Sequence, residues 1–158
     1  MERRVVDEET ILVPYYPNYE VALNWYQDPE TVMLVDGVSE PYDREKLERM
    51  YTYLEQHGEL YYIEAENGGE FRPIGDVAFW QYDMPIVIGE PEYRGKGIGR
   101  KAVEALVGRG RALGYGELFV GEIYDFNTAS QRCFESAGFR KFERKEKGWS
   151  YRLALVEG

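Results

Sequence analysis

Cysteine, histidine and long apolar runs are what this sequence has least of. Cys133 is the only cysteine among 158 residues, which excludes an intramolecular disulfide and suits a reducing compartment. No run approaches the roughly eighteen apolar residues that a membrane span needs. The N-terminal residues turn acidic before any apolar stretch, unlike a secretion signal. These absences predict a soluble, cytoplasmic protein.

Positive charge is also scarce, since 19 Lys and Arg face 29 Asp and Glu and the formal net charge is −10. An acidic field of this size repels nucleic acid and anionic membranes, and it attracts cationic ligands. The alternative is that the charge only keeps the protein soluble. The basic residues are unevenly spread, because the stretch from Arg94 to Lys101 holds four of them and no acid. This pattern favours one anionic ligand and one cationic ligand.

The length and composition predict one domain covering residues 1–158. Hydrophobic residues make up 44% and aromatic residues 15% of the chain, enough to bury a core without metals or disulfides. The sequence contains no internal repeat and no low-complexity linker.

Periodicity, capping residues and turn signals predict the secondary structure. Helices are expected at 19–27, 43–57, 98–113 and 128–137, and strands at 10–14, 60–65, 74–82, 85–89, 118–123, 141–145 and 150–156. Strands pair directly in the middle of the chain, and helices alternate with strands later. This order indicates an α/β or α+β fold with helices on both faces of one sheet.

The segment Arg94-Gly95-Lys96-Gly97-Ile98-Gly99 follows a predicted strand and opens a predicted helix. Alternating glycines let the backbone approach a ligand, and the helix adds unpaired N–H groups and the positive end of its dipole. The segment therefore suits a phosphate or pyrophosphate, with a ligand-free turn as the alternative. A Walker loop is excluded because Gly97 stands at the Ser/Thr position, and the glycine spacing does not supply a Rossmann fingerprint.

Two segments carry a family resemblance. Arg94, Gly97 and Gly99 meet the pattern Arg/Gln-x-x-Gly-x-Gly, and a second segment contains Asn127, Ser130, Cys133-Phe134 and Gly138-Phe139. Together they resemble the GNAT superfamily of N-acetyltransferases, and Arg132 to Phe139 is similar to aminoglycoside 6′-type members. The resemblance covers residues 74–156 well, and the earlier residues fit only in the order of their elements.

The resemblance implies a mixed, twisted, mostly antiparallel sheet of six to seven strands, splayed between the fourth (85–89) and fifth (118–123). It implies acetyl-CoA as co-substrate, with no metal. The pantetheine would bind the backbone of Val87 and Ile88, because splayed strands leave backbone groups unpaired. The pyrophosphate would bind the N–H groups of Arg94, Gly95, Lys96, Gly97, Ile98, Gly99 and Arg100, and further contacts would come from Asn127 and Phe134. Asn127 is alternatively a plain helix N-cap.

Members of this family generally transfer the acetyl group by direct attack of the amine in a ternary complex. Phe134 departs from the pattern, because many relatives carry a tyrosine there as general acid. Protonation of the thiolate would then rely on water, on another tyrosine or on the attacking ammonium. Cys133 occupies an apolar packing position in the family pattern, and the single histidine, His57, lies far away in sequence, so Cys133 is not expected to be a nucleophile.

Carboxylates are the candidates for the catalytic base. Glu122 comes first, because strand alternation places it on the same face as Val120, close to the splay. In the aminoglycoside 6′-type members an acid stands at this position. Asp76, Asp83 and Asp125 are the rivals, and each acid is alternatively a solvated surface residue.

The sequence and the resemblance leave three alternative functions. The first is acetylation of a primary amine on a small cationic molecule, polyamine-like or aminoglycoside-like, which would extend to antibiotic resistance. The second is acetylation of a protein N-terminus or lysine. The third is a non-catalytic acyl-CoA-binding regulatory module. A monomer or homodimer is expected, without nucleic-acid or membrane partners.

Overall fold

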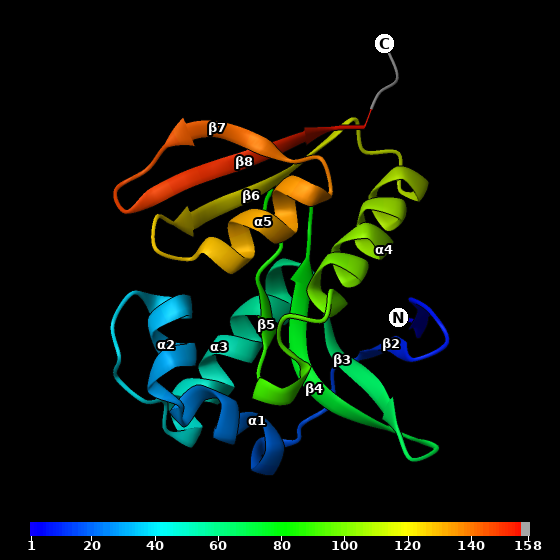
Figure 1. Ribbon diagram of the computed structural model, residues 1–158, viewed down its shortest axis with the longest axis vertical. Coiled ribbons are helices and arrows are strands. Elements are labelled where there is room, and N and C mark those ends of the chain that lie inside the picture. The colour runs from blue at the N-terminus through cyan, green and yellow to red at the C-terminus, as the bar shows by residue number, and fades with distance from the viewer. Residues whose placement is uncertain (156–158) are drawn as a thin grey trace.

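Residues 1–155, which the computed structural model describes, form eight strands in two antiparallel sheets and five α-helices (Figure 1). The sheets have the orders β1-β2-β3-β4-β5 and β6-β8-β7. The strands are β1 Arg4–Val5, β2 Thr10–Pro14, β3 Glu59–Asn67, β4 Glu70–Phe79, β5 Ile86–Ile88, β6 Glu117–Tyr124, β7 Arg140–Arg144 and β8 Gly148–Ala154. The helices are α1 Tyr19–Gln27, α2 Pro29–Asp36, α3 Arg44–His57, α4 Ile98–Ala112 and α5 Thr128–Ser136, with a 3₁₀ turn η1 at Pro91–Tyr93.

The predicted splay between the fourth and fifth strands is confirmed. Those strands are β5 and β6, and they lie at the edges of two different sheets. The strand number exceeds the expected six to seven because β1, only two residues long, pairs with β2 through Arg4 and Leu12. So short a strand leaves no alternation for a sequence to reveal.

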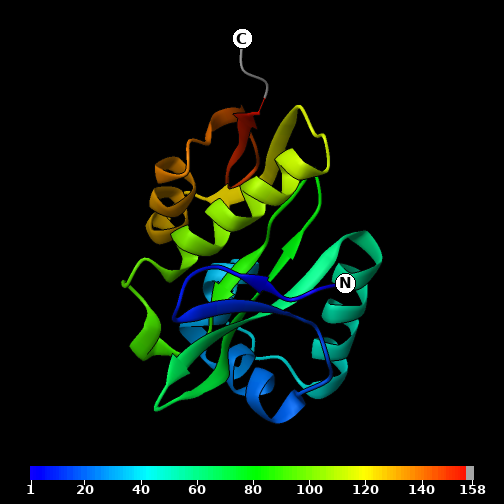
Figure 2. The ribbon, with the colours of Figure 1, turned by 90° about the vertical axis from the view of Figure 1, so that its right-hand side faces the viewer.

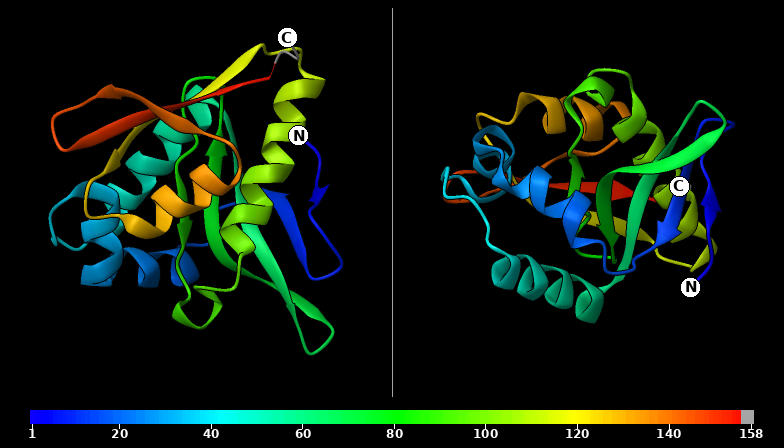
Figure 3. Two further views of the ribbon diagram at one scale, coloured as in Figure 1. Left: turned by 45° about the horizontal axis from the view of Figure 1, so that its top comes forward. Right: turned by 90° about the horizontal axis from the view of Figure 1, so that it is seen from below.

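Alternation along β3 builds a core on each face of the larger sheet. Tyr61 and Ile63 join the core under α4 and α5, whereas Leu60 and Tyr62 join the core under α1, α2 and α3. Figure 2 shows α4 and α3 on opposite sides of the central strands, and Figure 3 shows the strands between the two groups of helices. The expected coverage of both faces by helices is therefore confirmed. None of the helices in residues 1–155 has the length and apolar composition of a membrane span.

Helix α2 was not predicted. The pair Asp28-Pro29 does end α1 at Gln27, but the same pair also starts α2. Asp28 has extended backbone angles, and its carboxylate accepts the Thr31 N–H at 3.3 Å, while Pro29 occupies the first helical position, where it needs no N–H partner. Gly37, in the left-handed region at φ 76°, ends α2.

Several strand boundaries differ from prediction for local reasons. Strand β4 ends at Phe79 instead of residue 82, because Trp80 N–H bonds to the Asp83 carbonyl at 3.2 Å and closes a turn. Strand β8 begins two residues early, at Gly148. The expected end of that strand at Val156 lies outside the described residues.

Candidate active site

The start of α4 offers a run of backbone N–H groups to a ligand. Within residues 1–155, the N–H groups from Gly95 to Arg100 have no hydrogen-bond acceptor. The Arg94 N–H, which was expected to belong to this set, donates instead to the Pro91 carbonyl at 3.1 Å. The six free groups lie at the positive end of the α4 dipole, so they form a site for one anionic group.

Two glycines shape this loop. Gly95 and Gly97 have φ of 73° and 79°, the left-handed region that other residues adopt at a cost. A methyl group added at either would meet no protein atom within 4 Å. The loop therefore has open space beside its free N–H groups, and it fits a pyrophosphate. Gly99 differs, because a methyl group there would lie 3.6 Å from the Cys133 Sγ, where α4 packs on α5.

The basic residues of the loop are less free than their sequence spacing suggested. Arg94 reaches Asp28 at 3.9 Å, Arg100 pairs with Glu104 at 2.9 Å, and Lys101 pairs with Asp7 at 2.8 Å. The Lys96 ammonium lies 5.7 Å from the centroid of the Tyr93 ring. The capacity of the loop to hold an anion therefore comes mainly from the backbone, with Lys96 as its most available cation.

The gap between β5 and β6 is closed at one end by the turn that joins β4 to β5. Phe119 N–H on β6 donates to the Gln81 carbonyl at 2.9 Å. Gly121 N–H donates to the Asp83 carboxylate at 3.0 Å. We call the contacts of Gln81 and Asp83 with β6 the clasp. Beyond the clasp, β5 and β6 belong to different sheets and form no ladder with each other, and we call the unpaired interval between Ile88 and Tyr124 the gap.

Hydrogen-bond alternation decides which groups of β5 face this gap. Pro85 O accepts from Ala78 N–H, and Gly89 N–H donates to Ile74 O, so these pairs are hydrogen-bonded across to β4. Val87 lies two residues from both Pro85 and Gly89 and opposite Asp76, and hydrogen-bonded pairs recur every second residue in an antiparallel ladder. Its N–H and C=O therefore also point to β4. Of the two residues expected at the pantetheine, Ile88 therefore faces the gap and Val87 does not. Ile86 faces it as well.

Glu122 does not share a face with Val120, contrary to expectation. A β-bulge between Val120 and Ile123 interrupts the alternation, so both of those side chains are buried and Glu122 is exposed. Its carboxylate accepts the Lys147 N–H at 2.8 Å. Glu122 therefore lies on β6 just beyond the clasp, with its charge open to solvent.

The other three acids have protein partners. Arg144 binds both oxygens of Asp125, at 2.7 and 2.8 Å, and lowers the pKa of that carboxyl group. Asp83 accepts from the N–H groups of Gly121 and Met84, and burial raises its pKa. Asp76 is buried and accepts from two tyrosine hydroxyls, and burial raises its pKa to about 6. None of these contacts tests a catalytic role, but each gives the acid a structural one.

The second sequence motif lies on α5. The Asn127 side chain caps this helix through the Ser130 N–H at 3.1 Å. Phe134 is 2% exposed and packs edge-on against Phe139, with ring centroids 5.3 Å apart. Burial raises the pKa of Cys133 to about 11, which keeps it as a thiol in accord with a packing role. Contacts of Asn127 and Phe134 with a cofactor remain predictions.

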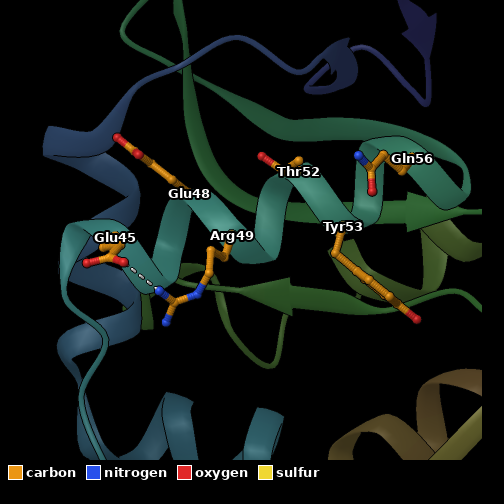
Figure 4. A pocket seen from close by; sticks show the side chains of 6 residues that line it. All are labelled: Glu45, Glu48, Arg49, Thr52, Tyr53 and Gln56. Atoms are coloured by element: carbon orange, nitrogen blue, oxygen red, sulfur yellow. Dashed lines mark hydrogen bonds and ion pairs between the residues drawn. The ribbon is translucent and has the colours of Figure 1, made fainter.

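Two of the surface hollows formed by residues 1–155 lie outside this gap. One, of about 410 Å³, is lined by α3 alone (Figure 4), and the ion pair between Arg49 and Glu45 at 2.9 Å crosses it. Groups from a single helix face do not converge on a ligand, so it is not the candidate site. The other, of about 220 Å³, has the rings of Tyr82, Phe119 and Phe142 in its wall and borders the clasp at Gly121.

Comparison with known families agrees with this geometry. The acetyltransferase (GNAT) domain matches residues 10–140. The chain belongs to the GNAT superfamily of N-acetyltransferases. An N-acetyltransferase 9-like protein of Caenorhabditis elegans is 26% identical over 93% of this chain and 80% of its own length. Because the chain is an N-acetyltransferase, the alternative of a non-catalytic module is set aside.

Solved structures extend the comparison. A domain from Methanocaldococcus jannaschii superposes on this GNAT chain with a TM-score of 0.80 and 25% identity, covering 94% of this chain and 100% of that domain. More distant neighbours, which share the fold alone, include an aminoglycoside acetyltransferase with coenzyme A, at 17% identity and TM-score 0.70, covering 92% of this chain and 95% of that one. A Vibrio cholerae spermidine N-acetyltransferase with CoA and spermine has 16% identity and TM-score 0.67, covering 92% and 94%.

Proposed function

We propose that this GNAT chain, acting as one domain over residues 1–158, transfers the acetyl group of acetyl-CoA to a primary amine of a small cationic molecule. The observation that supports it most is that six free N–H groups, from Gly95 to Arg100, follow β5, which does not pair with β6. A pyrophosphate on the loop N–H groups would leave the pantetheine next to the edge of β5. There the Ile86 and Ile88 N–H groups, turned away from β4, are donors for its amide oxygens.

Acetyl-CoA supplies an activated carbonyl, and the protein has to supply a neutral amine beside it. We assign Glu122 to hold the ammonium and accept its proton, because its carboxylate is exposed on β6 beyond the clasp. Asp125 and Asp83 are second choices, since Arg144 binds both oxygens of Asp125 and Asp83 accepts two backbone N–H groups, whereas Glu122 accepts one, from Lys147. Phe134 has no proton to give. The leaving thiolate would then take its proton from water, from another tyrosine or from the amine nitrogen, which becomes positively charged once the neutral amine has attacked.

A cationic acceptor suits the charge of this chain. The net charge of −10 raises the local concentration of cations. The distant neighbours include enzymes for aminoglycoside and spermidine, both polyamines in chemical character. Resistance to an aminoglycoside would follow only if such a compound is the acceptor.

Acetylation of a protein N-terminus or lysine is the second candidate. The hollow beside the clasp supports it, because Tyr82 and Phe142 are 62% and 49% exposed there and offer apolar surface to a peptide side chain. One distant structural neighbour, at 13% identity and TM-score 0.71, is a ribosomal L7/L12 alpha-N-protein acetyltransferase, covering 98% of each chain.

Two glycine variants test the cofactor site. Gly97 and Gly68 both have positive φ, 79° and 64°, and a methyl group at either meets no atom within 4 Å. Alanine at either should therefore destabilise the fold equally, by about 1–2 kcal/mol. Only Gly97→Ala should also weaken CoA binding in calorimetry, because Gly68 lies in the β3–β4 turn. Equal CoA affinity in the two folded variants would place the cofactor elsewhere.

The acceptor class is tested by release of free thiol from acetyl-CoA with spermidine, an aminoglycoside and a peptide with a free N-terminus. Turnover of the polyamine or aminoglycoside supports the first candidate. Turnover of the peptide alone replaces it with the second.

A further inference from the structure

Helix α2 bridges the open end of the gap between β5 and β6. At its first turn, the Thr31 hydroxyl accepts a hydrogen bond from Arg94 at 2.8 Å, and Arg94 also holds the end of β5. At its last turn, a methyl group added at Gly37 would lie 3.5 Å from the Tyr124 ring at the end of β6. Figure 1 shows α2 below the carboxyl end of β6. The helix is thus linked to β5 through Arg94, and Gly37, the residue that ends it, lies beside Tyr124 of β6.

Arg94 links three parts of the molecule through one guanidinium group. Its backbone directly precedes the free N–H groups of the cofactor loop. Its Nε donates to the Ile88 carbonyl at 2.9 Å, on the gap side of β5. Its Nη2 donates to the Thr31 hydroxyl, and that hydroxyl donates to the Asp28 carboxylate at 2.9 Å. The planar fork of an arginine fixes the relative direction of two such bonds, which a lysine cannot do.

The contact is partly buried, because the Arg94 side chain is 28% exposed whereas its partner Thr31 is buried. Thr31 is 2% exposed, and the neighbouring Val32 is fully buried in the core beneath α1, α2 and α3. A shift of Arg94 would therefore either break a hydrogen bond inside the protein or move the first turn of α2. The sequence motif alone suggests that this arginine serves the phosphate, whereas its side chain is turned toward α2.

We propose that Arg94 is a positioning residue that couples the cofactor loop to α2, so that CoA binding orders the helix that bridges the acceptor side of the gap. The inference rests on the proposed binding of CoA at Gly95 to Arg100. A ligand bound to the loop backbone restricts the position of the Arg94 guanidinium. The hydrogen bond from that guanidinium to the Thr31 hydroxyl then restricts the first turn of α2. By thermodynamic reciprocity, an acceptor that orders α2 strengthens CoA binding.

Hydrogen exchange of the full chain with and without CoA tests the coupling. In the wild type, CoA should slow exchange in residues 95–100 and also in α2, the latter by about fivefold or more. In Thr31→Val, the backbone bond that caps α2 is kept and only the hydroxyl is lost. CoA should then slow exchange in the loop but not in α2. Thr52→Val, on the exposed face of α3, is the matched control and should behave as wild type.

A second variant tests the coupling in case Thr31→Val does not fold. Arg94→Lys keeps the charge but cannot bridge Ile88 and Thr31, so it should also separate the loop from α2. With any amine that is turned over, both variants should raise the KM of the amine more than the KM of acetyl-CoA.

The outcomes separate this inference from the proposed function. Slowing of α2 that is equal in wild type and Thr31→Val overturns the coupling. So does slowing of the loop alone in the wild type, which leaves the proposed function standing. No binding of CoA to the wild type in calorimetry overturns the proposed function, and the coupling with it.

Discussion

Replacement of Asp76 by asparagine should change how the stability of the protein depends on pH. Burial raises the pKa of this carboxyl group to about 6 from an ordinary 3.8, although Tyr26 and Tyr51 each donate a hydrogen bond at 2.7 Å that opposes the rise. The folded state therefore binds the proton more tightly than the unfolded state. The resulting stabilisation is complete below about pH 3.8 and is lost as the pH rises through about 6.

The size of this effect follows from the two pKa values. A difference of one pKa unit corresponds to about 1.36 kcal/mol, so the full effect is about 3 kcal/mol, of which about 2.5 kcal/mol falls between pH 4 and pH 7.5. Asparagine does not titrate. Relative to Asp76→Asn, the free energy of unfolding of the wild type should thus fall by about 2.5 kcal/mol over this interval.

Urea unfolding followed by tryptophan fluorescence measures this difference, because Trp25 lies in the same core as the Tyr26 and Tyr51 rings. Asp125→Asn is the control of opposite sign. Arg144 lowers the pKa of Asp125, so the wild type should lose stability relative to that variant only on acidification. Parallel stability curves for wild type and Asp76→Asn from pH 4 to pH 7.5 would refute the reasoning.

Three further predictions concern activity. Glu122→Gln should lower kcat/KM by about 10²–10⁴ and make the residual activity rise with pH, since solution base must then produce the free amine; identical pH–rate profiles would remove Glu122 from the mechanism. Asp83→Ala should destabilise the fold by about 1–3 kcal/mol and weaken CoA binding, because the Gly121 N–H loses its acceptor. Asp83→Asn keeps an acceptor oxygen and serves as the control. Thermal melts measure the stability, and calorimetry measures the CoA affinity. Added salt should raise the KM of the amine by screening the acidic field, and a salt-independent KM reduces that charge to a solubility feature.

Features that depend on residues close together in the chain were predicted best, and features that depend on distant residues were predicted less well. The four predicted helices have ends within a residue of those in the structure, because caps such as Asp43 and Asn127 act on N–H groups three residues away. Helix α2 was missed because Asp28-Pro29 serves both as the end of α1 and as the start of the next helix. The position of Glu122 was wrong because a bulge depends on the partner strand β8, which no local pattern of β6 reveals.

Residues that are consecutive in the chain are sufficient to specify the glycine loop, the helix behind it and the family. A positive φ at Gly95 and Gly97 and the free N–H groups at a helix start are properties of consecutive residues, so a short motif contains them. The charges that remain available around that loop depend instead on contacts between residues far apart in the chain. Lys101 meets Asp7 across 94 positions, and Arg94 meets Thr31 across 63. Such partners depend on how the two sheets and α2 pack, because a charge is neutralised by whatever lies next to it in space and not by its neighbours in the chain.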